Sequence, residues 1–262
     1  PVVFNSGGTT ENNAVFDSNA NKIINVYKDG GASNYGNAIV GTVSGTSISF
    51  GSEATWNAGS TTNIGAAFDS TANKAVIAYR DDSNGDRSTA VVGTVSGTSI
   101  SFGSEVVFRD HPSPGRSNKH KVVYDPDQNK SVIAFSVESG GYGTCTVVTL
   151  SGTTPSFGSE ATFKSANVES IAPVYDSNSD KVVIAYSISG KGKGIVGTVS
   201  GTSISFGTEA EFSSTGSSVG DAAFDAHLNK IMVVFVEAVT THDGHYAIGT
   251  VSGTGISFAS KV

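Results

Sequence analysis

An internal repeat constrains the fold of this chain more than any other feature. The string GTVSGTSISFGSE occupies residues 41–53 and recurs unchanged at 93–105, and related strings begin at residues 148, 197 and 249. A second string, in which an aromatic residue precedes Asp, begins upstream of each copy, at Phe16, Phe68, Tyr124, Tyr175 and Phe224. Subtraction of these positions gives steps of 52, 56, 51 and 49 residues. Five similar units therefore fill the chain.

Each unit contains four short apolar segments separated by turn-forming residues. In the first unit they are 14–16, 22–27, 38–43 and a stretch within 47–56. Their β-branched residues and alternation are typical of strands, and the intervening Gly, Asn, Asp and Ser are typical of turns. Four strands in a repeat of this length indicate one blade of a β-propeller. We therefore predict an all-β, five-bladed β-propeller with four antiparallel strands per blade.

The chain ends predict how the ring closes. Four units end with an aromatic residue, and the fifth unit stops before one, whereas residues 1–4 supply Phe4. We expect residues 1–4 to pair with the strand at 257–262 in the last blade, because this pairing removes an open sheet edge. One domain over 1–262 is predicted, with blades at about 5–56, 57–108, 109–163, 164–212, and 213–262 plus 1–4.

Composition narrows the possible partners. The chain carries a net charge of -7 without a Lys/Arg cluster, so we expect no nucleic-acid partner. No apolar run reaches membrane-spanning length, so we expect no membrane insertion. Cys145 is the single cysteine, which excludes an intrachain disulfide and favours a buried hydrophobic role. We expect a monomer without a cofactor. The start at Pro1 indicates a processed chain or a piece of a longer one.

The loops fall into a constant set and a variable set. With the strands of a blade called a to d, the a–b and c–d loops of a propeller emerge on one face and the d–a and b–c loops on the other. The a–b and c–d loops (DSNANK, SGTS) are nearly the same in every unit, whereas the d–a and b–c loops differ. Binding usually resides on variable loops held by a rigid scaffold. We therefore predict ligand contacts from the d–a and b–c face.

The repeated Asp of the a–b loops admits a calcium site or a turn. Asp17, Asn19 and Asn21 have the spacing that begins many calcium loops, but Lys22 follows and no Glu supplies a bidentate ligand. An Asx turn, in which the Asp side chain accepts backbone N–H groups, explains the same residues without an ion. We favour the turn.

A second, weak calcium candidate lies in the second unit. Asp82, Asn84, Asp86 and Ser88 alternate as calcium ligands do, but the loop lacks the required glycine and the terminal Glu. We favour a solvated polar hairpin and predict no metal site.

Signals for catalysis are sparse. No nucleophile elbow, zinc-protease motif or phosphate loop occurs. Glycosidases need two converging carboxylates, and Glu11, Glu169 and Asp221 near the starts of inner strands are candidates. Solvated loop charges are the favoured interpretation. His242 and His245 with Asp243 could bind a metal, but we favour a polar loop tip. No catalytic residue is predicted.

Two tyrosines are the leading candidates for ligand contact. Tyr35 and Tyr142 occupy equivalent b–c loop positions, where another unit carries Arg87. Tyrosine rings stack on sugar faces while nearby polar groups bind the hydroxyls, although ordinary turn residues are an alternative. The predicted ligand-binding residues are Tyr35, Asn34, Arg80, Asp81, Arg87 and Tyr142.

The five near-identical units resemble the tachylectin-type propeller lectins and related repeat-built bacterial propellers. The resemblance covers the whole chain in architecture and repeat length, and no sugar-binding motif matches residue for residue. It implies a non-enzymatic, multivalent module for glycans or a surface polymer, in an extracellular, surface or virion-associated protein. The alternatives are a five-bladed glycoside hydrolase or lyase, and a structural or protein-interaction disc of a larger surface or viral fibre protein.

Overall fold

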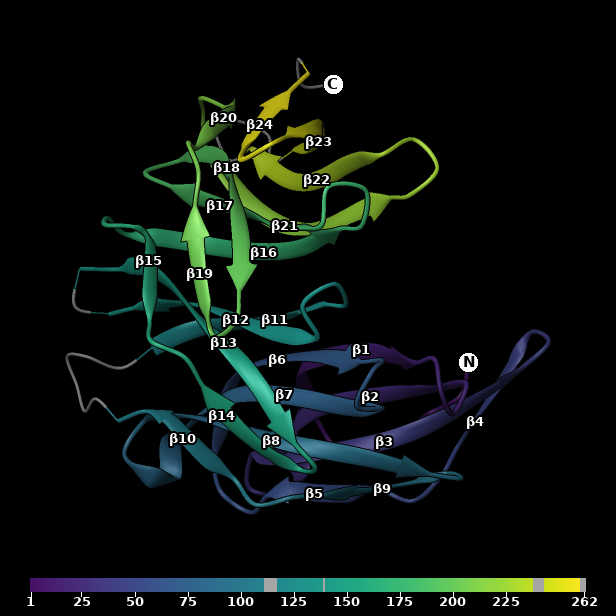
Figure 1. Cartoon of the computed structure of the whole chain (residues 1–262). Coiled ribbons are helices and arrows are strands. Elements are labelled where there is room, and N and C mark those ends of the chain that lie inside the picture. The colour runs from purple at the N-terminus through teal and green to yellow at the C-terminus, as the bar shows by residue number, and fades with distance from the viewer. Residues whose placement is uncertain (111–116, 139, 238–242, 260–262) are drawn as a thin grey trace. The chain divides into compact units, whose positions relative to one another are not determined.

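The protein consists of antiparallel sheets, one for each repeat unit (Figure 1). The computed structural model describes residues 1–110, 117–138, 140–237 and 243–259. Within these ranges the regular elements are 24 strands and two short 3₁₀ helices, which form five sheets. The all-β, five-bladed architecture predicted from the repeat is confirmed. The described residues contain no helix of the length and apolarity that crossing a membrane requires.

The first two sheets each contain five strands and one 3₁₀ helix. The first comprises β1(Thr9–Asp17), β2(Lys22–Asp29), η1(Gly30–Ala32), β3(Tyr35–Ser44), β4(Ser47–Phe50) and β5(Ala54–Asn57). The second comprises β6(Thr61–Asp69), β7(Lys74–Asp81), η2(Asp82–Asn84), β8(Arg87–Ser96), β9(Ser99–Phe102) and β10(Val106–Arg109).

The remaining three sheets repeat this strand order, and their described residues contain no 3₁₀ helix. The third comprises β11(Ser117–Asp125), β12(Lys130–Val137), β13(Tyr142–Ser151), β14(Thr154–Phe157) and β15(Ala161–Lys164). The fourth comprises β16(Val168–Asp176), β17(Lys181–Ile188), β18(Lys191–Ser200), β19(Ser203–Phe206) and β20(Ala210–Ser213). The fifth comprises β21(Ser217–Asp225), β22(Lys230–Glu237), β23(Asp243–Ser252) and β24(Gly255–Phe258).

The outer strand predicted for each unit is divided in the first four sheets. In the first sheet, β4 and β5 both pair with β3, and Gly51 lies between them. A Cβ on Gly51 would lie 1.8 Å from the carbonyl oxygen of Thr98 in the second sheet. The neighbouring hairpin therefore requires glycine here, and the strand is interrupted where that hairpin approaches.

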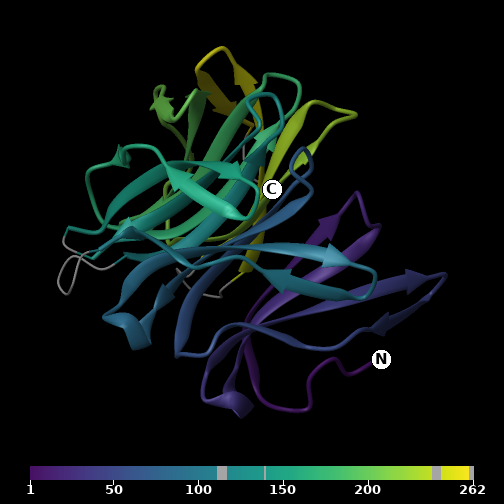
Figure 2. The ribbon, with the colours of Figure 1, turned by 60° about the horizontal axis from the view of Figure 1, so that its bottom comes forward.

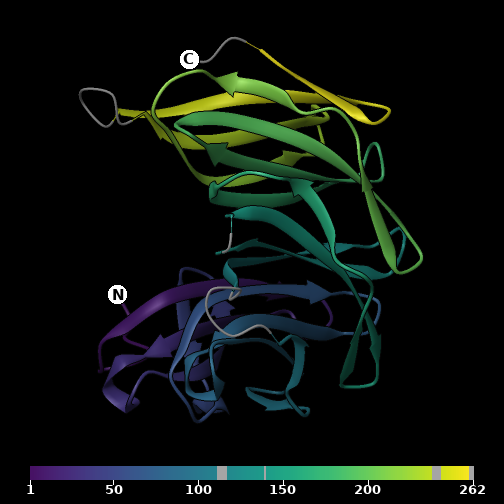
Figure 3. The same cartoon turned by 90° about the vertical axis from the view of Figure 1, so that its left-hand side faces the viewer.

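Contacts divide the chain into two compact units (Figures 2 and 3). The first unit is Pro1–Ser131 with Val148–Phe157, and the second is Val132–Val147 with Gly158–Val262. In the first unit, Ile24 and Val26 of the first sheet share a core with Ile77 of the second sheet. In the second unit, Val183 of the fourth sheet shares a core with Val233 of the fifth sheet. The division runs through the third sheet, and the single domain over 1–262 stays a prediction.

The aromatic residue that ends a unit packs on an aromatic residue of the following sheet. The ring centroids lie 4.6 Å apart for Trp56 and Tyr79, 5.3 Å for Phe163 and Tyr186, and 5.1 Å for Phe212 and Phe235.

Phe4 makes the same kind of contact with Tyr27, at 5.1 Å, so it occupies the aromatic position expected from the sequence. No described strand includes residues 1–4. Residues 260–262 of the expected partner strand lie outside the described residues. Closure of the ring by this pairing therefore stays a prediction.

Candidate functional site

The variable d–a and b–c loops lie at the same end of the sheets. In the first unit, the Thr61 N–H donates to the Asn34 carbonyl at 3.0 Å, and the Asp82 N–H donates to the Ser60 carbonyl at 2.9 Å. In the second unit, the Ser217 N–H donates to the Gly190 carbonyl at 2.8 Å. Each bond joins a d–a segment to a b–c loop, so within each compact unit residues of the two variable loop sets lie side by side.

The repeated Asp residues of the a–b loops make hairpin turns. Oδ1 of Asp17 accepts the N–H groups of Asn19 and Ala20 at 2.9 and 2.8 Å. In the other four units, Oδ1 of the equivalent Asp accepts N–H groups from two or three residues further along the chain. The equivalent Asp residues are Asp69, Asp125, Asp176 and Asp225. These are the contacts of the Asx turns predicted from the sequence. Among the described residues, no three His, Cys, Asp or Glu side chains gather as a metal-binding group.

Arg80 organises the second sheet's b–c loop. Its Nε lies 2.6 Å from Oδ1 of Asp82 and 3.7 Å from Oδ1 of Asp86, and its Nη1 donates to Asn118. The Thr62 hydroxyl donates to Asp82 at 2.9 Å. The guanidinium thus contacts two of the carboxylates proposed as weak calcium ligands. It supplies the positive charge that a cation would otherwise contribute there.

An open polar depression adjoins this loop. It has a volume of about 320 Å³ and is lined by Ser83, Asn84, Gly85, Arg87 and Asp110. Arg87 donates from Nε to Oδ1 of Asp110 and from Nη1 to Oδ1 of Asn84, both at 2.8 Å. The Arg87 side chain is 39% exposed and that of Asp110 is 64% exposed. Guanidinium donors therefore lie beside carboxylate and amide acceptors on a surface that a ligand can reach.

The other predicted binding residues differ in exposure. Asp81 is buried, and its Oδ1 accepts the N–H groups of Ser83 and Asn84 at 3.1 Å each, so it caps η2 and supports the depression. Asn34 is exposed in the first sheet, and the adjoining Tyr35 is partly buried at the start of β3.

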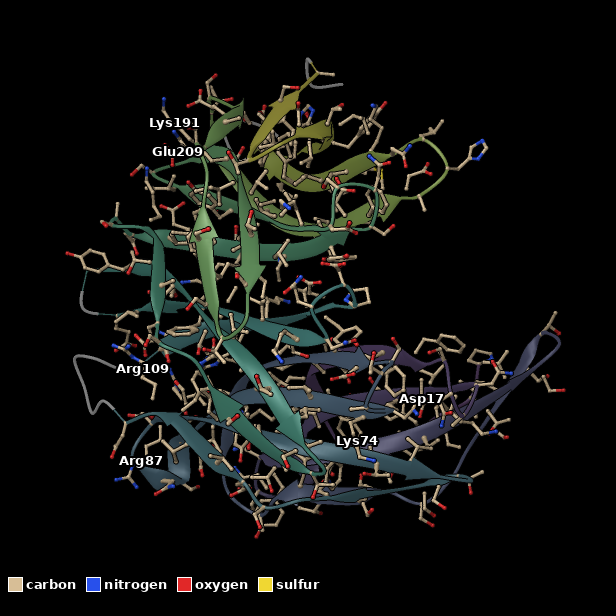
Figure 4. The ribbon with its side chains drawn as sticks, viewed as in Figure 1. Asp17, Lys74, Arg87, Arg109, Lys191 and Glu209 are labelled. Carbon is tan, nitrogen blue, oxygen red and sulfur yellow. The ribbon has the colours of Figure 1, made fainter. Side chains whose placement is uncertain are left out.

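Tyr142 begins β13 of the third sheet, in the second compact unit, and is 44% exposed. Arg80, Asp81 and Arg87 thus come together around one loop, and Tyr35 with Asn34 occupies another. Arg87 and Arg109 are labelled at the end of the second sheet that carries this loop (Figure 4).

Several site residues were missed by the sequence analysis. Asp110 follows β10 and has no repeated counterpart, so no sequence signal could identify it. Asp29 could have been found, because it ends the second strand of its unit as Asp81 does. Its carboxylate accepts from the Gly31 N–H at 2.8 Å and from Nδ2 of Asn5 at 2.9 Å.

A charged cluster lies at the corresponding end of the fourth sheet. Glu209 accepts from Nζ of Lys164 at 2.8 Å, from Nζ of Lys193 at 2.7 Å, and from the Tyr186 hydroxyl. Burial favours protonation, but these hydrogen bonds outweigh it and lower the pKa of Glu209 to about 2. Glu209 and the nearby Lys191 are labelled in Figure 4. The carboxylate is therefore committed to its lysine partners.

A buried histidine, His120, lies in β11 of the third sheet, within the first compact unit. Nδ1 of His120 lies 3.1 Å from the Asn63 carbonyl, and its Nε2 lies 3.2 Å from both the Ser88 and Ser117 hydroxyls. Burial lowers the pKa of His120 to about 3, so the ring is neutral at pH 7. Both serines are also buried, and this Ser–His group is therefore part of the core rather than a nucleophile open to a substrate.

The carboxylates considered for catalysis are placed differently. Glu11 accepts the Ile64 N–H at 3.1 Å, and Glu169 accepts the Gly190 N–H at 3.5 Å. Asp221 is exposed on the fifth sheet. His242 lies outside the described residues. His245 lies 3.8 Å from Glu237.

Comparison with known proteins supports the fold. No family model matches the chain, and no curated protein matches it. Three solved structures with the same fold are a Dos1 propeller, the NanB sialidase of Streptococcus pneumoniae, and an exo-β-1,3-galactanase of Phanerochaete chrysosporium solved with β-1,3-galactotriose.

The Dos1 propeller has a TM-score of 0.52 and 9% identity over 87% of this chain and 52% of that chain. The sialidase has a TM-score of 0.60 and 12% identity over 100% of this chain and 63% of that chain. The galactanase has a TM-score of 0.52 and 9% identity over 95% of this chain and 70% of that chain. At such identities the likeness shows the fold alone, which is that of a β-propeller.

Proposed function

We propose that this protein is a non-enzymatic recognition module that binds carbohydrate through its variable loop face. The observation that carries the proposal is the open depression lined by Asn84, Arg87 and Asp110. The neighbours named as a sialidase and a galactanase show that this fold can carry glycan chemistry. Since fold likeness alone does not transfer function, the proposal depends on the chemistry of the depression.

The depression matches the hydroxyl groups of a sugar. Arg87 offers guanidinium donors, while Asp110 and Asn84 offer oxygen acceptors, and adjacent sugar hydroxyls can both donate and accept. Arg87 and Asp110 carry opposite charges, so a neutral sugar is bound without an uncompensated charge. Tyr142 lies on β13 and does not line this depression, but its exposed ring offers a stacking surface of its own. Such a module acts outside the cell, at a cell surface or on a virion.

The test compares Arg87→Ala with Lys22→Ala. Lys22 begins β2 beside the Asx turn, in the constant loop set. Wild-type protein is screened against immobilised neutral and acidic glycans and then titrated with the best ligand. Loss of a charged hydrogen-bond donor costs about 1.5–3 kcal/mol, so we expect Arg87→Ala to bind at least tenfold more weakly. Lys22→Ala should bind as the wild type does.

Two outcomes contradict the proposal. If the wild-type protein binds no glycan, the proposed function is wrong. If Arg87→Ala binds glycan as tightly as the wild type does, the depression is not the binding site. Thermal midpoints of both variants distinguish loss of a contact from loss of the fold.

A further inference from the structure

The second sheet's b–c loop contains the one Asn-Gly pair of the sequence, at Asn84 and Gly85. We propose that Asn84 is a site of spontaneous deamidation, assisted by Arg87. Asn84 is the last residue of η2, and both members of the pair are exposed. The reaction needs water but no enzyme or cofactor.

Gly85 leaves the reacting amide accessible. The backbone nitrogen of the residue after asparagine is the nucleophile in this reaction, and a side chain on that residue hinders the attack. Gly85 has no side chain, and no atom beyond its two chain neighbours lies within 4 Å of the position that a Cβ would take. Its φ of +73° ends the 3₁₀ helix in a left-handed conformation that glycine adopts without strain.

Arg87 holds the atom on which negative charge develops. Its Nη1 donates to Oδ1 of Asn84 at 2.8 Å. When the Gly85 nitrogen adds to Cγ, this oxygen becomes an oxyanion, and a cationic donor already in place stabilises it. The same guanidinium is anchored through its Nε to Asp110, which fixes its direction.

The proposed step balances as follows. Hydroxide takes the proton of the Gly85 N–H, and the nitrogen forms a bond to Cγ of Asn84. Nδ2 takes a proton from water, which regenerates hydroxide, and the bond from Cγ to Nδ2 breaks to release ammonia. Water adds to either carbonyl of the resulting succinimide ring. Ring opening leaves Asp or isoaspartate at position 84. Because the nucleophile must lose a proton, the rate rises with pH.

The product changes the charge of the loop. A new carboxylate joins those of Asp82, Asp86 and Asp110 and replaces the amide that contacts Arg87. We expect Arg87 to be held more strongly by the carboxylate after the change, so its donors are less available to a ligand. Ageing would thus alter this depression without altering the sheets.

Asn34 is a matched control within the chain. It lies in the equivalent loop of the first sheet and is exposed, but Tyr35 follows it in place of glycine. We therefore expect Asn34 to keep its amide while Asn84 loses it.

The test is an incubation of the full chain at neutral and mildly alkaline pH, followed by peptide mass mapping and enzymatic labelling of isoaspartate. Wild type should convert at position 84, faster at the higher pH, while position 34 remains unchanged. Asn84→Gln should show no isoaspartate in this peptide. Arg87→Ala should convert several-fold more slowly, with thermal midpoints confirming that both variants are folded.

Equal persistence of Asn84 and Asn34 in wild type would overturn the proposal. Conversion in Arg87→Ala at the wild-type rate or faster would overturn the role of Arg87. Both readouts are independent of glycan binding, so they do not depend on the proposed function.

Discussion

The fourth and fifth sheets use the same repeat position in opposite environments. Val183 and Ala185 of β17 are fully buried, and they share a core with Val233 of β22. Met232 and Val234 occupy the corresponding positions of β22 and are 42% and 39% exposed. The alternation along the strand is the same in both sheets. The comparison teaches that the repeat sets which side chains share a face, whereas a following sheet decides whether that face is buried.

The glycine at the end of each outer hairpin follows the same division. In the fourth sheet, a Cβ on Gly207 would lie 1.8 Å from the carbonyl oxygen of Thr254 in the fifth sheet. In the fifth sheet Ala259 takes this place, and its N–H donates to the Ile248 carbonyl as that of Gly207 does to the Val196 carbonyl, both at 2.9 Å. Ala259 is exposed. The fifth repeat thus departs from glycine where no described hairpin approaches.

The largest expected effect breaks the buried face. Ala185→Asp places an unpaired carboxylate in the core between the fourth and fifth sheets, and we expect a loss of about 3–5 kcal/mol in the free energy of unfolding. Val234→Asp is the matched change on the exposed face and should cost less than about 1 kcal/mol. Urea denaturation of both variants measures the difference. Equal destabilisation would mean that the fifth-sheet face is also covered in solution.

A second prediction tests a buried position that is polar in the third sheet and apolar in the fourth. His120 in β11 and Ile171 in β16 share the fourth position of their strands, and both are buried. The pKa of His120 is lowered from 6.5 to about 3 by burial, so only the unfolded chain gains its proton between these values. The contribution of His120 to the free energy of unfolding is therefore most favourable above about pH 6.5 and decreases as the pH falls toward 3.

Between about pH 6.5 and pH 4, the loss in the free energy of unfolding should be smaller in His120→Gln than in the wild type by a few kcal/mol. Denaturation curves of wild type and variant at several pH values measure it. Parallel pH profiles would show that other groups cause the acid sensitivity.

The smallest expected effect concerns the two hairpin ends. Gly207→Ala forces a methyl group against the Thr254 carbonyl, and we expect a loss of about 1–3 kcal/mol. The reciprocal change, Ala259→Gly, should cost less than about 1 kcal/mol because the residue is exposed. Thermal unfolding of both variants checks the pair. If Gly207→Ala were harmless, the close approach of the Thr254 hairpin would be wrong.

Much of the fold could be predicted from local sequence, because its signals act over a few residues. The alternation in KAVIAY places Val76 and Ile77 on opposite faces of β7, and the Asp of each a–b loop makes its turn with residues two or three positions away. The five units and their strands follow from such signals. The variable loops likewise pointed to the region around Arg80 and Arg87.

Tertiary structure decided which side chains meet across longer separations. Gly51 interrupts an outer strand because Thr98 lies against it, and Arg80 contacts Asn118 from the following sheet. Arg87, which begins β8, likewise meets Asp110, which directly follows the outer strand β10. A repeat pattern specifies the strand and its faces, but these contacts form only after sheets pack and loops return, so the sequence by itself determined the blades and the packed sheets decided the site.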